Sequence, residues 1–394
     1  MADVVKSTNI LFIGGASSGK TVAASSTYYK MNADGGVGDD KVKFDLTSIG
    51  NAGAANNTEL FDNFIRMLKG TFPNGSIDNK YYDFAFRRNA ETICEIMWMD
   101  YRGANIEENW PDDDSGDSVK KSDIQEFKAM LRHAMILIYI IPGDIVQKYS
   151  DLEKLPPQSL ERTIGMAEIT KEMGQFNFIM EKVKELRKDD YQKIPILFYI
   201  TKSDELVCDD REKFSKLTAF LKSHRLLKGH EKILGCHSTL GRDLIVEDNT
   251  IKAGIVPEGF EIPLMLTVGY FISDEGKEWE TRENARIDAE VQLEQGKIAR
   301  GYQELGGLQS GFVYNVFGPS KKKREQIQKL EKKAAESKAK MLELENDRKK
   351  LDNRLKSYSQ DILSYIEQCT DDNCKYVIYM NEEGEERPLR EFFE

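Results

Sequence analysis

The sequence predicts an α/β fold with a mostly parallel sheet, helices on both faces, one antiparallel edge strand and a C-terminal helical extension. Apolar, β-branched runs alternate with helix-like stretches between residues 5 and 237, as in chains that build a parallel sheet. Runs such as MILIYII and IPILFYI are apolar without alternation, which is typical of strands buried on both faces. From residue 327 a heptad-like spacing replaces this pattern.

Composition excludes several classes of protein. The 394 residues are 40% hydrophobic and 31% charged, a balance typical of globular proteins, and the length allows two or three structural units. No apolar run of about 18 residues or more occurs, so we expect no transmembrane segment and a cytoplasmic protein. Five cysteines without a CxxC pair and four histidines without an HxxxH pair predict neither a disulfide framework nor a zinc site.

The net charge of −11 is unevenly distributed. Residues 321–356 hold 14 basic and 7 acidic side chains, whereas the regions on either side are acidic. An acidic globular region repels nucleic acid, so we do not expect a nucleic-acid partner. The run KKKR at 321–324 could bind anionic lipid or a phosphate-bearing polymer, but a solvated helix start is the more frequent meaning of such a run.

The expected elements follow in order along residues 1–275, which we assign to one domain. The strands are 5–14, 41–46, 81–86, 93–100, 135–141, 196–201 and 233–237. The helices are 20–31, 58–69, 123–133, 159–187 and 211–227. Few residues separate 80–88 from 91–100, so this pair predicts a hairpin that supplies the antiparallel edge strand.

Three further parts are expected after residue 275. Residues 262–300 predict one long helix or two in series, so 276–320 becomes a helical connector that ends in a Gly-rich hinge. Apolar or small residues recur every three or four positions over 327–365, which favours a coiled-coil helix over 321–368. A single helix packed on the globular domain is the alternative. Residues 369–394 predict a short hairpin or a strand added to another element.

The strongest chemical signal is the segment GGASSGKT, which fits GxxxxGK[ST] between an apolar strand and a helix. Glycines let the backbone wrap a polyphosphate, and the following helix presents its positive N-terminal end. Lys20 would reach the β- and γ-phosphates, and the Thr21 hydroxyl would ligate Mg²⁺. A Gly/Ser-rich turn with an idle lysine is the alternative. The candidate nucleotide-binding residues here are Gly15, Ala16, Ser17, Ser18, Gly19, Lys20 and Thr21.

A second motif, DYRG, stands at the end of the run ICEIMWMD. Asp100 can hold Mg²⁺ through water, and the Gly103 backbone N–H can approach a γ-phosphate. Alone this motif is weak, because an aspartate that closes a strand is common. Its place after a second core strand strengthens it.

A third motif, TKSD, follows the core strand 196–201. The Asp204 carboxylate can accept two hydrogen bonds from guanine, whereas adenine would leave these acceptors unpaired. Lys202 would pack its stem along the base, and Thr201 belongs to the same contact loop. By itself, the motif could be an ordinary helix N-cap. Three motifs in order, each at the carboxyl end of an apolar strand, make coincidence a poor explanation.

With these motifs, residues 5–275 resemble the translation-factor-related (TRAFAC) class of P-loop GTPases with a Ras-like G domain. The helix before TFPNGSID and the stretch IVPEGFEIPL look similar to bacterial double-GTPase-like domains. The resemblance implies GTP and GDP as ligands and Mg²⁺ as cofactor. It also implies a serine or threonine that covers Mg²⁺ from the first switch, for which Ser76 is the candidate and Thr71 and Thr47 are less well placed. It implies nucleotide contacts in the last loop, at His237 and Ser238.

One departure bears on catalysis. The position after DxxG is often a Gln or Glu that orients the attacking water in this class, but here it is Ala104, which cannot do so. Lys20 and Arg102 are therefore the candidate catalytic residues, and Glu107 and Glu108 are candidates for positioning water. A solvated switch segment is the alternative for Arg102 and for both glutamates.

The sequence favours a switch protein that hydrolyses GTP to GDP and phosphate with Mg²⁺. It would couple the nucleotide state to its helical arm, which binds a protein partner or self-associates through the 327–365 heptads. Two alternatives remain open. One is a nucleotide-binding scaffold with little or no turnover, and the other is an ATP-using P-loop protein in which TKSD is only a helix cap.

Overall fold

The computed structural model describes residues 5–74, 79–101, 118–152, 154–206, 208–241, 243–247, 250–309, 321–370 and 376–393. The chain divides into two compact units. The first comprises Met1–Phe271 and Asp361–Glu394, and the second is Ile272–Gln360. These units do not follow the four parts expected from the sequence, because the last segment of the chain rejoins the first unit.

The first unit is built on a ten-stranded mixed sheet, so the predicted α/β class with a large, mostly parallel sheet is confirmed. Five neighbouring strands in its centre run parallel. In spatial order they are β8 (Ile233–His237), β7 (Ile196–Thr201), β6 (Leu137–Pro142), β1 (Val5–Ile13) and β5 (Glu91–Asp100). All five were expected from apolar runs in the sequence.

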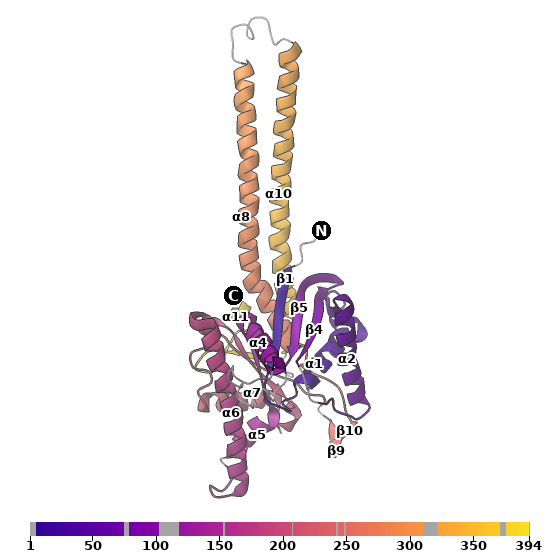
Figure 1. The fold of residues 1–394 in the computed structure, drawn as a ribbon, viewed down its shortest axis with the longest axis vertical. Helices are drawn as coiled ribbons and strands as arrows, with labels where there is room; N and C mark the ends of the chain where they lie inside the picture. The colour runs from indigo at the N-terminus through magenta and orange to yellow at the C-terminus, as the bar shows by residue number, and fades with distance from the viewer. Residues whose placement is uncertain are drawn as a thin grey trace. The chain divides into compact units, whose positions relative to one another are not determined.

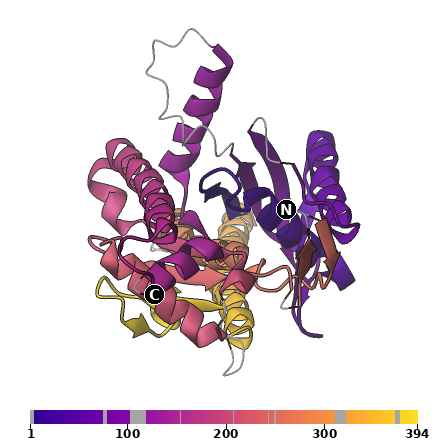
Figure 2. The same ribbon diagram turned by 90° about the horizontal axis from the view of Figure 1, so that it is seen from below.

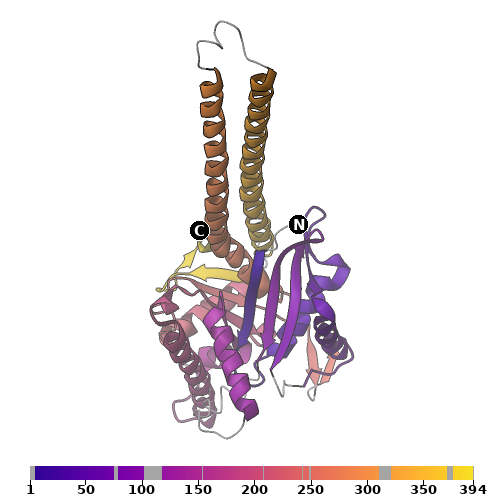
Figure 3. The same ribbon diagram turned by 45° about the horizontal axis from the view of Figure 1, so that its top comes forward.

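Antiparallel pairings extend the sheet on both sides of the parallel strands, whereas we expected a single antiparallel edge strand. Beyond β5 lie β4 (Lys80–Arg88), β3 (Lys43–Ser48) and β2 (Val37–Gly38). Beyond β8 lie β11 (Val377–Met380) and β12 (Glu386–Arg387), the two yellow arrows of Figure 3. A strand as short as β11 is stable here because it pairs with β8 and so covers a sheet edge.

Helices cover both faces of the sheet (Figures 1 and 2). One face carries α1 (Lys20–Asn32) and α2 (Gly50–Leu68), together with the start of α8 (Ile262–Gln309) and the end of α10 (Lys321–Gln368). Glu261 joins these elements, because it forms an ion pair with Lys30 at 3.2 Å and accepts a hydrogen bond from Tyr365 at 2.8 Å. The other face carries α4 (Ser118–His133), α5 (Gly143–Leu152), α6 (Leu160–Arg187) and α7 (Asp210–Ser223).

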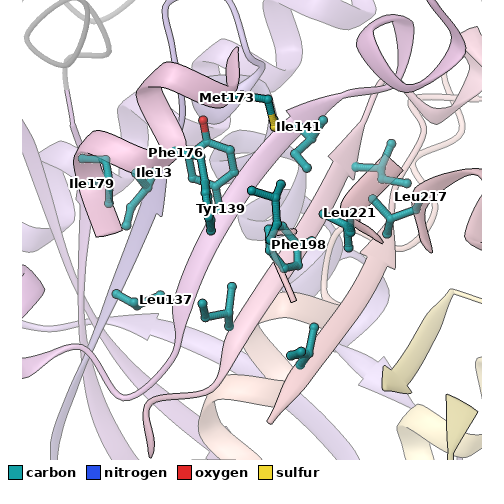
Figure 4. Close-up of a cluster of buried hydrophobic side chains, with 14 of the residues drawn as sticks. Ile13, Leu137, Tyr139, Ile141, Met173, Phe176, Ile179, Phe198, Leu217 and Leu221 are labelled. Carbon is teal, nitrogen blue, oxygen red and sulfur yellow. The ribbon is translucent and has the colours of Figure 1, made fainter. Parts of the chain in front are cut away.

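The central strands bury side chains on both faces, which explains the unbroken apolar sequences of β6 and β7. Leu11 and Ile13 face α6 and its neighbours, whereas Ile10 and Phe12 alternate with them towards the other face. Figure 4 shows part of the cluster of buried side chains on the α6 side of the sheet, where Tyr139 and Phe198 of adjacent strands pack against Phe176 of α6. Each fully buried side chain of this size stabilises the fold by about 1.5–3 kcal/mol. This core holds the carboxyl ends of the parallel strands in fixed positions.

The second unit is an antiparallel pair of helices formed by α8 and α10. Ser273 Oγ and Ser359 Oγ lie 3.1 Å apart, and Glu294 Oε1 lies 3.7 Å from Lys340 Nζ, which sets the register. Residues 301–309, expected as part of a hinge, continue α8, and the rest of that expected hinge lies outside the described residues.

The heptad positions of α10 contact the same chain. Ile327, Ala334, Leu355 and Tyr358 are buried, although most of α10 is exposed. The seam that we expected to recruit a partner is therefore covered in part within one chain. No helix in the described ranges is long and apolar enough to cross a membrane.

Candidate functional site

The three sequence motifs meet at one edge of the sheet. β1 lies between β5 and β6, so the strand order reverses beside it, and this is where open α/β sheets bind ligands. The Gly-rich loop follows β1, Asp100 ends β5, and Thr201 ends β7. Because these strands are parallel, their carboxyl ends share one edge of the sheet.

The Gly-rich loop wraps around the ammonium group of Lys20. Lys20 Nζ donates to the carbonyl oxygens of Gly14 at 2.9 Å and Gly15 at 2.6 Å, and to Ser18 Oγ at 3.3 Å. Gly19 has a φ of +93°, which a glycine adopts without strain, and a Cβ there would lie 3.3 Å from Thr201. The loop therefore holds a cation at the N-terminus of α1, which is suitable for binding an anion.

Thr21 and Asp100 form a pair next to this lysine. Thr21 Oγ1 donates to Asp100 Oδ2 at 2.8 Å, and Asp100 is buried. A hydroxyl and a carboxylate are hard oxygen ligands of the kind that Mg²⁺ prefers. In the described parts of the chain no three His, Cys, Asp or Glu residues form a metal-binding group. The pair fits Mg²⁺, which is commonly held by one or two protein oxygens and completed by phosphate and water.

The TKSD segment is tied directly to the Gly-rich loop. Thr201 is buried, and its Oγ1 donates to the Ser18 carbonyl oxygen at 2.6 Å. Lys202 adopts a left-handed conformation with a φ of 51°. Gly143, the first residue of α5, packs so closely that a Cβ there would lie 2.3 Å from the Lys202 carbonyl oxygen. The position of Asp204 is thus coupled to the loop around Lys20.

A cavity of about 770 Å³ opens over these segments, within the size range of small-molecule sites. Of the predicted residues, Ala16, Ser17, Gly19, Lys20, Thr21, Thr201, Lys202 and Asp204 line it. Gly15, Ser18 and Asp100 are buried beside it, where they support the lining.

The structure does not bring His237 and Ser238 to this cavity. Both are buried, and neither lines it. His237 Nε2 lies 3.6 Å from Asp210 Oδ1, and Ser238 Oγ accepts a hydrogen bond from Tyr199 at 2.7 Å. Their side chains therefore pack in the interior at the end of β8 and not towards the cavity.

The next residue, Thr239, is also buried and does not line the cavity, but it contacts a residue that does. Thr239 Oγ1 donates to Asp204 Oδ1 at 3.1 Å and accepts from the backbone N–H of Gly241 at 3.0 Å. It thereby orients the candidate base-binding carboxylate. The TKSD motif and the loop after the strand 233–237 could have indicated this contact, but the exact position depends on where β8 ends.

Sequence reasoning expected only one group of the apolar residues that line the cavity, the segment from Phe72 onward, which belongs to the expected first switch. The apolar lining residues come from the segment after α2, from the chain beyond Thr239 and from the turn before α8. They are Phe72, Pro73, Leu240, Leu244, Val246 and Phe260. The sequence carries no signal for this convergence, because the segments are far apart along the chain.

Helix α6 packs against the Gly-rich loop through Gln175. A Cβ on Gly15 would lie 2.6 Å from Gln175 Oε1, so this side chain is packed against the loop. One turn earlier, Glu172 Oε1 accepts a hydrogen bond from Tyr139 at 2.8 Å. Burial raises the pKa of the Glu172 carboxyl above its ordinary value, although the Tyr139 hydrogen bond and the charge of Lys20 oppose this shift.

The other predicted site residues, Ser76, Arg102 and Gly103, lie outside the described residues, as do Ala104, Glu107 and Glu108. Thr71 lines the cavity, whereas Thr47 belongs to β3 and does not line it. Comparison with known proteins adds no assignment, since no family model and no curated protein matches this sequence.

Proposed function

We propose that the protein is a P-loop GTPase that binds GTP and GDP with Mg²⁺ and hydrolyses GTP to GDP and phosphate. The observation that carries this proposal is the Thr21–Asp100 pair, 2.8 Å between oxygens, beside the Lys20 ammonium group in a Gly-rich loop. This arrangement combines a cation, helix N-terminal amides and two oxygen ligands at one end of a cavity.

The phosphate end of the nucleotide would lie on the Gly-rich loop. Lys20 would exchange its hydrogen bonds to the Gly14 and Gly15 carbonyls for bonds to phosphate oxygens, which are stronger because both partners are charged. Thr21 and Asp100 would hold Mg²⁺, which neutralises phosphate charge and orients the γ-phosphate when bound. The protein thus contributes position and positive charge, which are the main requirements of phosphoryl transfer.

The base end would lie against Asp204. Its carboxylate, held by Thr239, would accept hydrogen bonds from the guanine N1 and N2 groups. Adenine would leave the carboxylate unsatisfied, and such a mismatch is costly once the bound base has excluded water from Asp204, which is exposed in the free protein. The Thr201–Ser18 hydrogen bond sets the distance between base end and phosphate end, so one nucleotide can reach both.

Hydrolysis would be an in-line attack of water on the γ-phosphate, with Lys20 stabilising the developing charge. We assign a charge-stabilising role to Arg102, which follows Asp100 by two positions. Ala104 provides no group that orients water, so we expect slow turnover in the absence of a partner. A scaffold that binds nucleotide without turnover remains the second proposal, and Ala104 is the observation that favours it.

The nucleotide state would be transmitted to the helical arm. The first turns of α8 and the last turns of α10 belong to the first unit, and Glu261, directly before α8, pairs with Lys30 of α1. Since α1 begins at the Gly-rich loop, it provides a path from the nucleotide to the roots of both long helices. The arm would then present this state to a protein partner in the cytoplasm.

The decisive experiment measures nucleotide preference by calorimetric titration with GTP, ATP and xanthosine triphosphate in the presence of Mg²⁺. We expect the wild type to prefer GTP, and Asp204→Asn to shift the preference towards xanthosine triphosphate, because an amide can donate to the base oxygen. Lys20→Ala should abolish binding of all three. Equal affinity of the wild type for ATP and GTP would contradict the guanine assignment. Phosphate release under excess GTP separates the enzyme from the scaffold.

A further inference from the structure

The chain that follows Thr239 forms a narrow two-stranded ribbon, here called the β9–β10 ribbon (residues 239–241, 243–247 and 250–258). Thr239 pairs with Glu258 at its base, and the Val256 N–H donates to the Leu240 carbonyl at 2.6 Å. A Cβ on Gly241 would lie 1.8 Å from the Gly254 carbonyl oxygen, so the two sides approach as closely as glycine allows. Beyond this neck lie β9 (Ile245–Glu247) and β10 (Thr250–Ala253).

The far part of this ribbon is attached to the segment after α2. The Ile251 N–H donates to the Gly70 carbonyl at 2.9 Å, and Thr250 forms an antiparallel bridge with Thr71. All three ribbon views show the β9–β10 pair beside α2 (Figures 1, 2 and 3). The contact joins segments about 180 residues apart in sequence, so it is a tertiary contact and not a local turn.

Both attached segments line the same cavity. The ribbon contributes Leu240, Leu244 and Val246, and residues 71–74 contribute the facing part of the lining. The ribbon begins at Thr239, which holds Asp204 at the base end of the proposed nucleotide site. Residue 74 leads on towards Ser76, the candidate first-switch residue. The ribbon and its hydrogen bonds to residues 70–71 therefore connect the base end with the segment that enters the first switch.

We propose that the β9–β10 ribbon is a positioning clamp that holds residues 70–74 against the bound guanine nucleotide and thereby slows its release. The inference rests on the proposed function. A nucleotide that fills the cavity would contact both segments of its lining, and the Gly70–Ile251 and Thr71–Thr250 contacts would oppose the separation of these segments during release. The clamp makes the occupancy of the base end and the position of the first switch depend on each other.

The first test locks the clamp with a disulfide. Directly opposed residues of an antiparallel bridge have the spacing that a disulfide needs, so T71C combined with T250C should cross-link on mild oxidation of the full chain. We expect the oxidised protein to release N-methylanthraniloyl-GDP about tenfold more slowly than the same protein after reduction, equivalent to about 1.4 kcal/mol. T250C alone, treated identically, is the control. Unchanged release from a fully cross-linked sample overturns the clamp.

The second test weakens the same contact. Gly70 has a φ of +93°, and a Cβ there would lie 2.8 Å from the Ile251 carbonyl oxygen, so Gly70→Ala pushes the two segments apart. Gly35→Ala is a matched control, because Gly35 has a φ of +80° but no atom within 4 Å of a Cβ. We expect about tenfold faster GDP release from Gly70→Ala and wild-type release from Gly35→Ala.

The outcomes distinguish the two proposals. Equal release rates from both glycine variants overturn the clamp and leave the nucleotide site intact. A wild-type protein that binds neither GDP nor GTP overturns the proposed function and the clamp with it. Slower release on cross-linking, together with faster release from Gly70→Ala alone, supports both.

Discussion

At the scale of single residues, the Thr21 hydroxyl is the group whose removal tests the metal site most directly. Thr21→Ala removes the proposed ligand of Mg²⁺ and keeps Lys20 in place, so we expect GTP affinity to fall at least about tenfold with Mg²⁺ present and to change little with a chelator. Ser25→Ala is the control, since it removes a buried hydroxyl from the same helix without touching the cavity. Equal losses in both conditions would contradict the assignment of Thr21 as a metal ligand.

His230 gives a second prediction, on stability against pH. Burial lowers the pKa of His230 from 6.5 to about 4, so the unfolded chain binds a proton more readily than the folded chain between these values. This side chain therefore stabilises the fold fully above about pH 6.5, and its contribution is lost as the pH falls to about 4. The melting temperature of His230→Phe should fall less steeply over this window than that of the wild type.

Single residues also show where sequence reasoning reaches its limit. Lys20, Asp100 and Thr201 lie together because each is placed at the carboxyl end of a strand that the apolar pattern identifies, Lys20 after the loop that follows β1. His237 and Ser238 were assigned to the nucleotide by position in a loop, yet both face the interior. The neighbouring Thr239 contacts Asp204 instead, so a difference of one residue at the end of β8 decides which side chain supports that carboxylate.

At the scale of elements, the apolar runs predicted all five parallel strands, and the unbroken runs of β6 and β7 are those expected of strands buried on both faces. They did not predict that β11 would pair with β8, about 140 residues earlier in the chain. Four residues carry too little periodicity to specify a partner, and the pairing depends on an exposed sheet edge that exists only in the folded unit. The packing of Gln175 of α6 against Gly15 was missed too, because it joins segments about 160 residues apart in the chain.

The packing of α5 on the TKSD segment yields a third prediction. Gly143→Ala would place a Cβ 2.3 Å from the Lys202 carbonyl oxygen, a backbone atom, so the loop that carries Asp204 must move. We expect GTP affinity to fall about tenfold or more in a binding titration. Gly174→Ala is the matched helical control, with nothing within 4 Å of its Cβ, and it should stabilise the protein by roughly 0.5–1 kcal/mol through helix propensity. If both variants bind GTP like the wild type, the α5 contact does not position the base loop.

At the scale of the whole molecule, the first unit is assembled from two pieces separated by the entire second unit. The returning piece contributes the end of α10, β11, β12 and α11 (Arg390–Phe393). It is bound by Arg88, which forms an ion pair with Asp361, and by the β8–β11 pairing. The carboxyl-terminal segment is therefore part of the first unit, which carries the candidate nucleotide site, and not an appendage of the arm.

The last prediction compares two deletions of this chain. Removal of 361–394 takes away eight buried hydrophobic side chains among the described residues, of which the six least exposed are Ile362, Ile366, Val377, Ile378, Met380 and Phe392. The burial of these six is worth about 9–18 kcal/mol at about 1.5–3 kcal/mol each, which matches or exceeds the total stability of about 5–15 kcal/mol expected for a domain. The truncated chain should therefore lose cooperative thermal unfolding and nucleotide binding together.

Excision of 274–358 removes more residues but should do less harm. Ser273 and Ser359 have hydroxyl oxygens 3.1 Å apart, so a short Gly/Ser linker can join the two helices without strain and retain both pieces of the first unit. We expect this variant to unfold cooperatively by circular dichroism and to bind GTP with wild-type affinity. If the truncated chain folds and the excised chain does not, the arm stabilises the site and the returning segment does not.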